Sequence, residues 1–135
     1  MHRWIRITLT LTSTFAAIQV TGQLGIFTGG VNTYTAIPSF DIYTHALGSA
    51  ALGAAMLSFI SLGRYDMSWR VWIPFQVATV GTLWELAELT VTWLGLLPPQ
   101  QISATIENSI QDIFIDLLGV CSISFLYELS EDRSK

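Results

Sequence analysis

Four apolar stretches, each long enough to cross a lipid bilayer as a helix, constrain this chain more than any other feature. They lie near residues 4–27, 41–62, 70–96 and 103–127, and a helix needs about 20 apolar residues to span the hydrocarbon core. The segments between them are rich in Gly, Pro and polar residues, as turns are. A composition of 51% hydrophobic and 12% charged residues indicates the same class. We therefore predict an all-α integral membrane protein, a four-transmembrane-helix bundle that forms a single domain over residues 1–135.

Basic residues predict the orientation of the four spans. Lys and Arg occur before the first span, in the second loop and at the C-terminus, whereas the first and third loops contain neither. Because cytoplasmic segments carry the excess of Lys and Arg, we expect both termini on the cytoplasmic side of the inner membrane. The first stretch also has the basic start and short apolar centre of a cleaved signal peptide. Its apolar run continues past any cleavage site, which favours a span.

Acidic residues inside the predicted spans are the main functional signal. Glu85 and Glu88 lie in the outer half of the third span, given a rise of about 1.5 Å per residue. The second and fourth spans start on the same side of the membrane and carry polar residues at a similar depth, namely Asp41, His45, Glu107, Asp112 and Asp116. Two pairs among these residues are four positions apart and so share a helix face. The sequence therefore predicts an outward-facing carboxylate and histidine pocket between the second, third and fourth helices.

The negative charge of this pocket needs a counterpart, because every Lys and Arg is expected at the opposite side of the membrane. An acid at the centre of a membrane helix costs about 2.5–3.5 kcal/mol, and neighbouring acids repel one another. Carboxylates with one imidazole are ligands typical of Mn, Fe and Zn and less typical of Mg or Ca, and helix bundles build metal sites from inward-facing Glu and His. We predict a divalent-metal site with five ligands, His45, Glu85, Glu88, Asp112 and Asp116, and with Asp41 and Glu107 as further candidates.

Two other functions fit the same residues. The acids could be protonated and hydrogen-bonded within a structural polar core, helped by nearby Gln19, Gln23, Asn108 and Gln111, in a noncatalytic accessory subunit of a larger membrane complex. They could also serve proton or cation passage. Besides the lipid bilayer, the expected partners are other membrane subunits or further copies of the chain. Six Lys plus Arg are too few and too scattered for nucleic acid.

An enzymatic activity is left open by the sequence. It has no nucleophile-elbow, zinc-protease or phosphate-loop motif. His45 or Glu88 could act as a general base if a substrate entered from the outer leaflet, with a metal ion polarising an oxygen. Elsewhere in the second stretch, Ser49 and Gly53 form a small-xxx-small pattern that predicts close helix packing.

A family resemblance rests on three short patterns at these positions, in the order Asp41-x-x-x-His45, Trp84-Glu85-x-x-Glu88 and Asp112-x-x-x-Asp116-x-x-Gly119. Over residues 41–120 the chain resembles the uncharacterised YjdF-type inner-membrane proteins and, more distantly, the VanZ-like family. VanZ-like proteins typically carry Lys, Gln and Asn where this chain has Ile42, Glu88 and Asp116. These departures remove a positive charge and add two negative ones, which disfavours a glycopeptide-resistance role and favours a cation site. The resemblance implies the fold rather than a reaction.

Overall fold

The computed structural model describes residues 3–37, 39–63, 68–96 and 106–132, and within them the chain is helical without any β-strand. Its elements are α1 (Arg3–Gln23), the short η1 (Ile26–Thr28), α2 (Thr33–Ala36), α3 (Phe40–Ser61), α4 (Trp69–Trp93) and α5 (Ile106–Asp132). The four long helices match the four predicted stretches to within a few residues. The predicted start of the fourth stretch, at residue 103, lies outside the described residues. The all-α prediction is confirmed.

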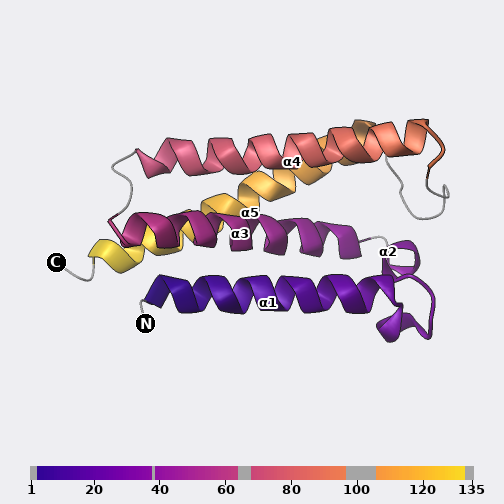
Figure 1. The fold of residues 1–135 in the computed structure, drawn as a ribbon, viewed down its shortest axis with the longest axis horizontal. Helices are drawn as coiled ribbons and strands as arrows, with labels where there is room; N and C mark the ends of the chain where they lie inside the picture. The colour runs from indigo at the N-terminus through magenta and orange to yellow at the C-terminus, as the bar shows by residue number, and fades with distance from the viewer. Residues whose placement is uncertain (1–2, 38, 64–67, 97–105, 133–135) are drawn as a thin grey trace.

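The four long helices lie alongside one another in alternating directions (Figure 1). α3 lies between α1 and α4 in that view and contacts every other long helix, while α5 crosses at a slant and also contacts α4. The start of α1 and the end of α5 lie at one end of the bundle, called here the termini end. The short elements η1 and α2 lie at the opposite end, called here the α2 end (Figure 1).

Membrane character is clearest in two of the helices. Within the described residues, α3 and α5 are long and apolar enough to cross a bilayer, whereas α1 and α4 do not meet the same criterion. The outer faces of α3, α4 and α5 nevertheless carry large apolar side chains that are more than half exposed, including Phe59, Phe75, Leu83, Phe114 and Phe125. A continuous apolar surface of this kind marks contact with lipid or protein rather than with water.

The apolar core occupies the half of the bundle near the termini end. Its central side chains come from α3, α4 and α5 and are almost completely buried, namely Ala54, Leu57, Ile73, Val77, Val120 and Ile123. Trp4 and Trp69 both pack against the ring of Tyr127, with ring centroids 4.9 Å and 5.2 Å away. These contacts close the core where α1 begins and α5 ends.

Small residues let α3 and α5 approach closely, as the Ser49 and Gly53 pattern predicts. A Cβ atom on Gly53 would lie 2.9 Å from a methyl carbon of Val120, and one on Gly119 would lie 2.2 Å from Oγ of Ser49. Contacts this short essentially never occur for real Cβ atoms. A larger residue at Gly119 would push the two helices apart, because the Ala46 backbone carbonyl also lies there, whereas at Gly53 the contact is with side-chain methyl groups.

The connection between α1 and α3 is packed onto the α2 end of the bundle. Asn32 caps α2 by accepting a hydrogen bond from the backbone N–H of Tyr34 at 2.9 Å, and its side-chain amide donates to Gln23 at the same distance. The hydroxyl of Tyr34 donates to Gln19. In this structure the two glutamines of α1 therefore bond to the connection, rather than to the acids that we considered as their partners.

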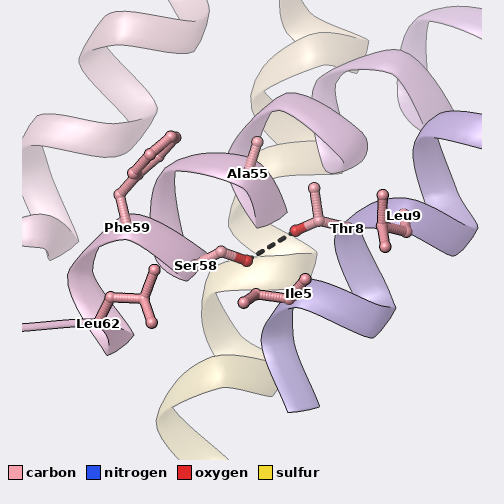
Figure 2. A pocket seen from close by; sticks show the side chains of 7 residues that line it. All are labelled: Ile5, Thr8, Leu9, Ala55, Ser58, Phe59 and Leu62. Carbon is pink, nitrogen blue, oxygen red and sulfur yellow. Dashed lines mark hydrogen bonds between the residues drawn. The ribbon is translucent and has the colours of Figure 1, made fainter. Parts of the chain in front are cut away.

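An apolar groove of about 240 Å³ separates part of α1 from α3, and its lining consists of Ile5, Thr8, Leu9, Ala55, Ser58, Phe59 and Leu62 (Figure 2). The hydroxyls of Thr8 and Ser58 satisfy each other across it at 2.8 Å. No ionisable side chain lines this groove, so it is separate from Asp41 and His45 at the other end of α3.

Candidate metal centre

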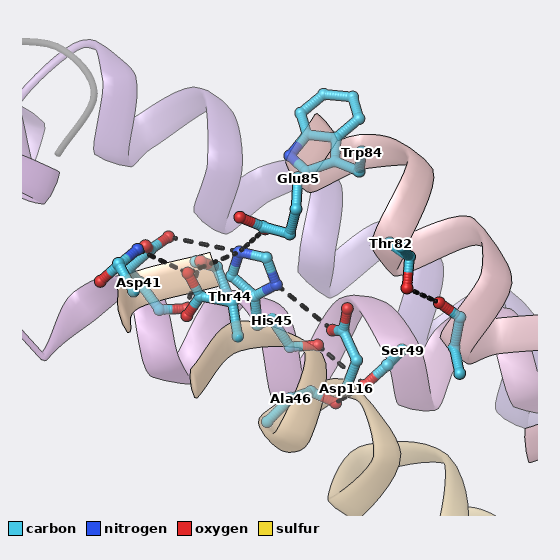
Figure 3. Close-up of polar contacts among 12 residues, drawn as sticks. Asp41, Thr44, His45, Ala46, Ser49, Thr82, Trp84, Glu85 and Asp116 are labelled. Atoms are coloured by element: carbon cyan, nitrogen blue, oxygen red, sulfur yellow. Dashed lines mark hydrogen bonds and ion pairs between the residues drawn. The ribbon is translucent and has the colours of Figure 1, made fainter. Parts of the chain in front are cut away.

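Five ionisable side chains from three helices gather in the half of the bundle near the α2 end. α3 contributes its first two turns, α4 its second half, and α5 its first half, and the residues are Asp41, His45, Glu85, Asp112 and Asp116. Figure 3 labels Asp41, His45, Glu85 and Asp116 of this group. His45 lies at the centre of the group, with a side chain that is 14% exposed. Residues from all three spans that were predicted to converge therefore do lie together.

The two nitrogens of the His45 imidazole face different partners. Nε2 lies 3.7 Å from Oδ1 of Asp41, 3.8 Å from Oε1 of Glu85 and 3.9 Å from Oδ2 of Asp112. Nδ1 lies 3.3 Å from Oδ1 of Asp116, within hydrogen-bonding distance. One side of the ring thus faces three carboxylates, and the other side faces a single carboxylate.

Burial makes the excess negative charge of this group costly. Glu85, Asp112 and Asp116 are 3%, 2% and 7% exposed, whereas the Asp41 side chain is 34% exposed and forms the open edge. Oε1 of Glu85 is buried and has no hydrogen-bond partner among the described residues. One imidazolium could balance only one of the four carboxylates, so the group as a whole calls for a further cation or for protons.

Basic side chains within the described part of the chain belong to the opposite end of the bundle. Arg3 and Arg6 lie in the first turns of α1, and Arg70 lies in the first turn of α4. Arg70 donates a hydrogen bond to Glu128 at 2.7 Å and lies over the ring of Trp69. None of these guanidinium groups is placed to neutralise the carboxylates around His45.

The ligand atoms around Nε2 are spaced closely enough to share an ion. One atom each from Asp41, His45 and Asp112 lie within 4.8 Å of one another. Metal–ligand bonds of about 2.0–2.2 Å in a tetrahedral site put the ligand atoms roughly 3.4 Å apart. The observed separations from Nε2, 3.7–3.9 Å, exceed that value by a few tenths of an ångström, so the carboxylates would have to move inward to bind an ion. The donor set of imidazole and carboxylates fits a divalent transition metal.

The remaining candidate residues lie outside this central contact. Glu88 accepts a hydrogen bond from the indole N–H of Trp84 at 2.8 Å, on a more exposed face of α4 than Glu85. Glu107 is exposed in the first turn of α5. Asn108 donates to Oδ2 of Asp112 at 2.6 Å and so orients that carboxylate.

Tyr34 borders the group from α2. Burial raises the pKa of its phenol above the usual value, a hydrogen bond with Thr44 acts in the opposite direction, and the charges of Asp41 and Glu88 raise the pKa further. The phenol therefore keeps its proton at neutral pH and remains a donor, which it directs to Gln19.

Two glycines that were not predicted as site residues shape the site directly, although Gly119 is the last residue of one of the three family patterns. A Cβ atom on Gly81 of α4 would lie 2.4 Å from Oδ2 of Asp116, and Gly119 permits α5 to pack against Ser49 of α3 one turn further along. The spacing between each glycine and a nearby acid could have indicated this role in the sequence. Gly81 precedes Glu85 by four residues, and Gly119 follows Asp116 by three. Such spacing places each glycine on the same helix face as the acid.

Comparison with known proteins identifies a family. A family model described as "Predicted membrane protein (DUF2238)" matches residues 1–133 of the chain. No curated protein sequence and no solved structure matches the chain. The match covers nearly the whole sequence and confirms the prediction of an uncharacterised membrane family, while the more distant resemblance to VanZ-like proteins stays a prediction.

Proposed function

Because the chain belongs to the DUF2238 family of predicted membrane proteins, we propose that it is a multi-pass inner-membrane protein that holds one divalent metal ion. In this proposal residues 1–135 form one domain, and α1, α3, α4 and α5 all cross the bilayer. The arginines at the termini end support a cytoplasmic location for that end, since cytoplasmic segments carry the excess of basic residues. The α2 end and the carboxylate group near it then face outward.

We propose four side chains as ligands. His45 supplies Nε2, and Asp41, Glu85 and Asp112 supply one carboxylate oxygen each. The observation that carries this assignment is the convergence of three carboxylates on one imidazole nitrogen at 3.7–3.9 Å. The buried Oε1 of Glu85, which points toward His45 in Figure 3, supports it further. A buried carboxylate oxygen without a donor is stabilised most directly by a cation.

A metal ion accounts for this group better than a protonated polar core does. A core of neutral acids needs a hydrogen bond for each buried oxygen and hydroxyl. Asn108 supplies one to Asp112, but the glutamines of α1 are bonded to Tyr34 and Asn32, and Oε1 of Glu85 has no partner among the described residues. One divalent ion offsets most of the charge of three carboxylates at once. The imidazole ligand favours Mn, Fe or Zn over Mg or Ca.

Access to the proposed site is from the outside, past Asp41. Its side chain is the most exposed of the four proposed ligands, and it lies in the first turn of α3 beside α2. The ion would be loaded or released at this edge without crossing the apolar half of the bundle. This arrangement supports capture of a metal ion at the outer surface more than passage through the membrane.

Metal content tests the proposal. The protein would be purified in detergent without chelator, and bound metals would be measured by mass spectrometry for the parent and for two matched variants of α4. Glu85→Gln removes a proposed ligand charge, whereas Glu88→Gln removes an equal charge three residues away, where the carboxylate bonds Trp84. We expect Glu85→Gln to weaken binding by at least about tenfold, or about 1.4 kcal/mol, and Glu88→Gln to keep the parent's affinity.

A parent protein without stoichiometric metal, whose melting temperature ignores added Mn, Fe, Zn, Mg and Ca, would overturn the proposal. The polar core of an accessory subunit would then be the better explanation. Equal losses of metal in the two variants would contradict the ligand assignment, because Glu88 would then contribute as much as Glu85.

A further inference from the structure

We propose that Asp116 is a positioning residue, which keeps a proton on Nδ1 of His45 and so leaves Nε2 for the ion, and that Gly81 provides the space its carboxylate needs. The part of this inference that concerns the metal rests on the proposed function. The contacts between Asp116, His45 and Gly81 belong to the protein itself and can be tested without any ion.

The geometry of the imidazole separates Asp116 from the proposed ligands. Oδ1 of Asp116 lies 3.3 Å from Nδ1 (Figure 3). The carboxylates of Asp41, Glu85 and Asp112 lie around Nε2 instead. A hydrogen bond from Nδ1–H to a carboxylate determines which nitrogen retains its proton and fixes the orientation of the ring. Since the two ring nitrogens point in different directions, Asp116 cannot share an ion with Nε2 while it accepts this bond.

Gly81 explains how the carboxylate of Asp116 is accommodated. Asp116 lies between two helices, with Oδ1 toward His45 of α3 and Oδ2 toward the backbone of α4. An ideal Cβ atom on Gly81 would lie 2.4 Å from Oδ2 and 3.4 Å from Cγ of Asp116, and the three nearest atoms all belong to that side chain. Any residue with a Cβ atom would therefore occupy the space of Oδ2.

The backbone that carries Asp116 has little freedom to relieve such a clash. One turn further along α5, Gly119 packs against the Ala46 carbonyl and the Ser49 hydroxyl of α3, where an added Cβ atom would lie within 2.4 Å of both. With the helix held there, a methyl group at Gly81 acts mainly on the short Asp116 side chain. We expect the carboxylate to rotate, so that Oδ1 leaves Nδ1 of His45.

Gly81→Ala is the test variant, and Gly53→Ala is its matched control. Both substitutions add one methyl group at a buried glycine of the same bundle, and both create a close contact. At Gly53 the contact is with methyl carbons of Val120 and Ile123, at 2.9 Å and 3.0 Å. A general effect of overpacking would therefore appear in both variants, while an effect on His45 would appear only in Gly81→Ala.

The experiment combines two measurements on the detergent-solubilised protein. The first measurement follows the ring protons of ¹⁵N-labelled histidine by NMR, and the His45 signals are identified because they are missing from the spectrum of His45→Gln. The second measurement is a competition titration with Zn²⁺. In the parent we expect a slowly exchanging Nδ1 proton, and we expect this proton to stay in place when Zn²⁺ binds. In Gly81→Ala the Nδ1 proton should exchange rapidly, and Zn²⁺ affinity should fall by about 10–100-fold. Gly53→Ala should match the parent in both measurements.

The outcomes separate this inference from the proposed function. If the parent binds Zn²⁺ and Gly81→Ala behaves like Gly53→Ala, the positioning role is overturned and the metal site stands. Displacement of the Nδ1 proton by Zn²⁺ in the parent would likewise overturn it. If the parent binds no metal but loses its protected Nδ1 proton in Gly81→Ala, the contact is supported and the metal site is overturned.

Discussion

The interface between α3, α4 and α5 has two halves that both contain almost completely buried side chains but are chemically opposite. The apolar half, near the termini end, contains Ala54, Leu57, Ile73, Val77, Val120 and Ile123 at 0–6% exposure. The polar half, near the α2 end, contains Glu85, Asp112 and Asp116 at 2–7% exposure, together with His45 and Asp41. The same three helices therefore enclose an apolar core, which carries no charge, and next to it a cluster of carboxylates whose negative charge must be neutralised.

Glycine serves the two halves in different ways. In the apolar half, Gly53 brings α3 close to Val120, which increases the dispersion contacts that hold membrane helices together. In the polar half, Gly81 leaves room for a carboxylate oxygen. Close approach thus stabilises one half directly, whereas in the other half it serves the position of a charged group.

A charge placed in the apolar half should have the largest effect. Val120→Asp would put a carboxylate at a site with 0% exposure, within the cluster of apolar core side chains. An intramembrane Asp costs about 2.5–3.5 kcal/mol before any steric term, so we expect little monodisperse protein in size-exclusion chromatography. Val120→Thr is the control, because its hydroxyl can bond a backbone carbonyl one turn earlier, as Ser122 does. Normal yield from Val120→Asp would contradict the difference between the halves.

Removal of metal should have the next largest effect, and it should act on the polar half alone. At an ion concentration of 100 times Kd, binding stabilises the folded state by about 2.7 kcal/mol. We expect a chelator to lower the melting temperature of the parent and of Leu57→Ala by similar amounts, since Leu57 lies in the apolar half. His45→Gln should show no chelator effect. A chelator effect that persists in His45→Gln would place the ion elsewhere.

Removal of one carboxylate should stabilise the metal-free protein and destabilise the metal-bound protein. In the metal-free protein, Asp112→Asn removes one of several like charges and keeps an oxygen that can accept the bond from Asn108. We expect a gain in stability of about 1 kcal/mol or less. With metal present the same variant should be less stable than the parent, because a ligand charge is lost. Thermal unfolding with and without Zn²⁺ measures both signs, and an equal loss in both conditions would indicate a packing role.

Single cysteine substitutions at exposed positions should have the smallest effect on stability, and labelling of these cysteines would show which half of the bundle faces outward. Thr35→Cys lies on an exposed position of α2, and Ser68→Cys lies on an exposed position at the start of α4. With both termini cytoplasmic, a membrane-impermeant thiol reagent applied to intact cells should label the first variant and not the second. Cys121→Ser would be the background for both. The reverse pattern would place the polar half near the cytoplasm.

Depth along each helix was predictable from residue number. A helix rises by a constant amount per residue, so the apolar stretches and the basic residues were enough to place acids of three spans in the same half of the bundle. The four long helices were predictable for the same local reason, since length and apolarity do not depend on contacts. Their number as membrane spans stays a prediction, because α3 and α5 meet the length and hydropathy criterion for a span and α1 and α4 do not.

The rotation of each helix about its axis depended on packing between helices. Glu85 and Glu88 are three residues apart and looked equivalent, yet Glu85 is buried beside His45 whereas Glu88 bonds Trp84 on a more exposed face. Asp112 and Asp116 share a face of α5, yet they meet different nitrogens of one imidazole. A shift of one residue turns a side chain by about 100°. Contacts between helices, such as those made at Gly81 and Gly119, decide which carboxylates reach His45, because they set how closely, and with which faces, the helices meet.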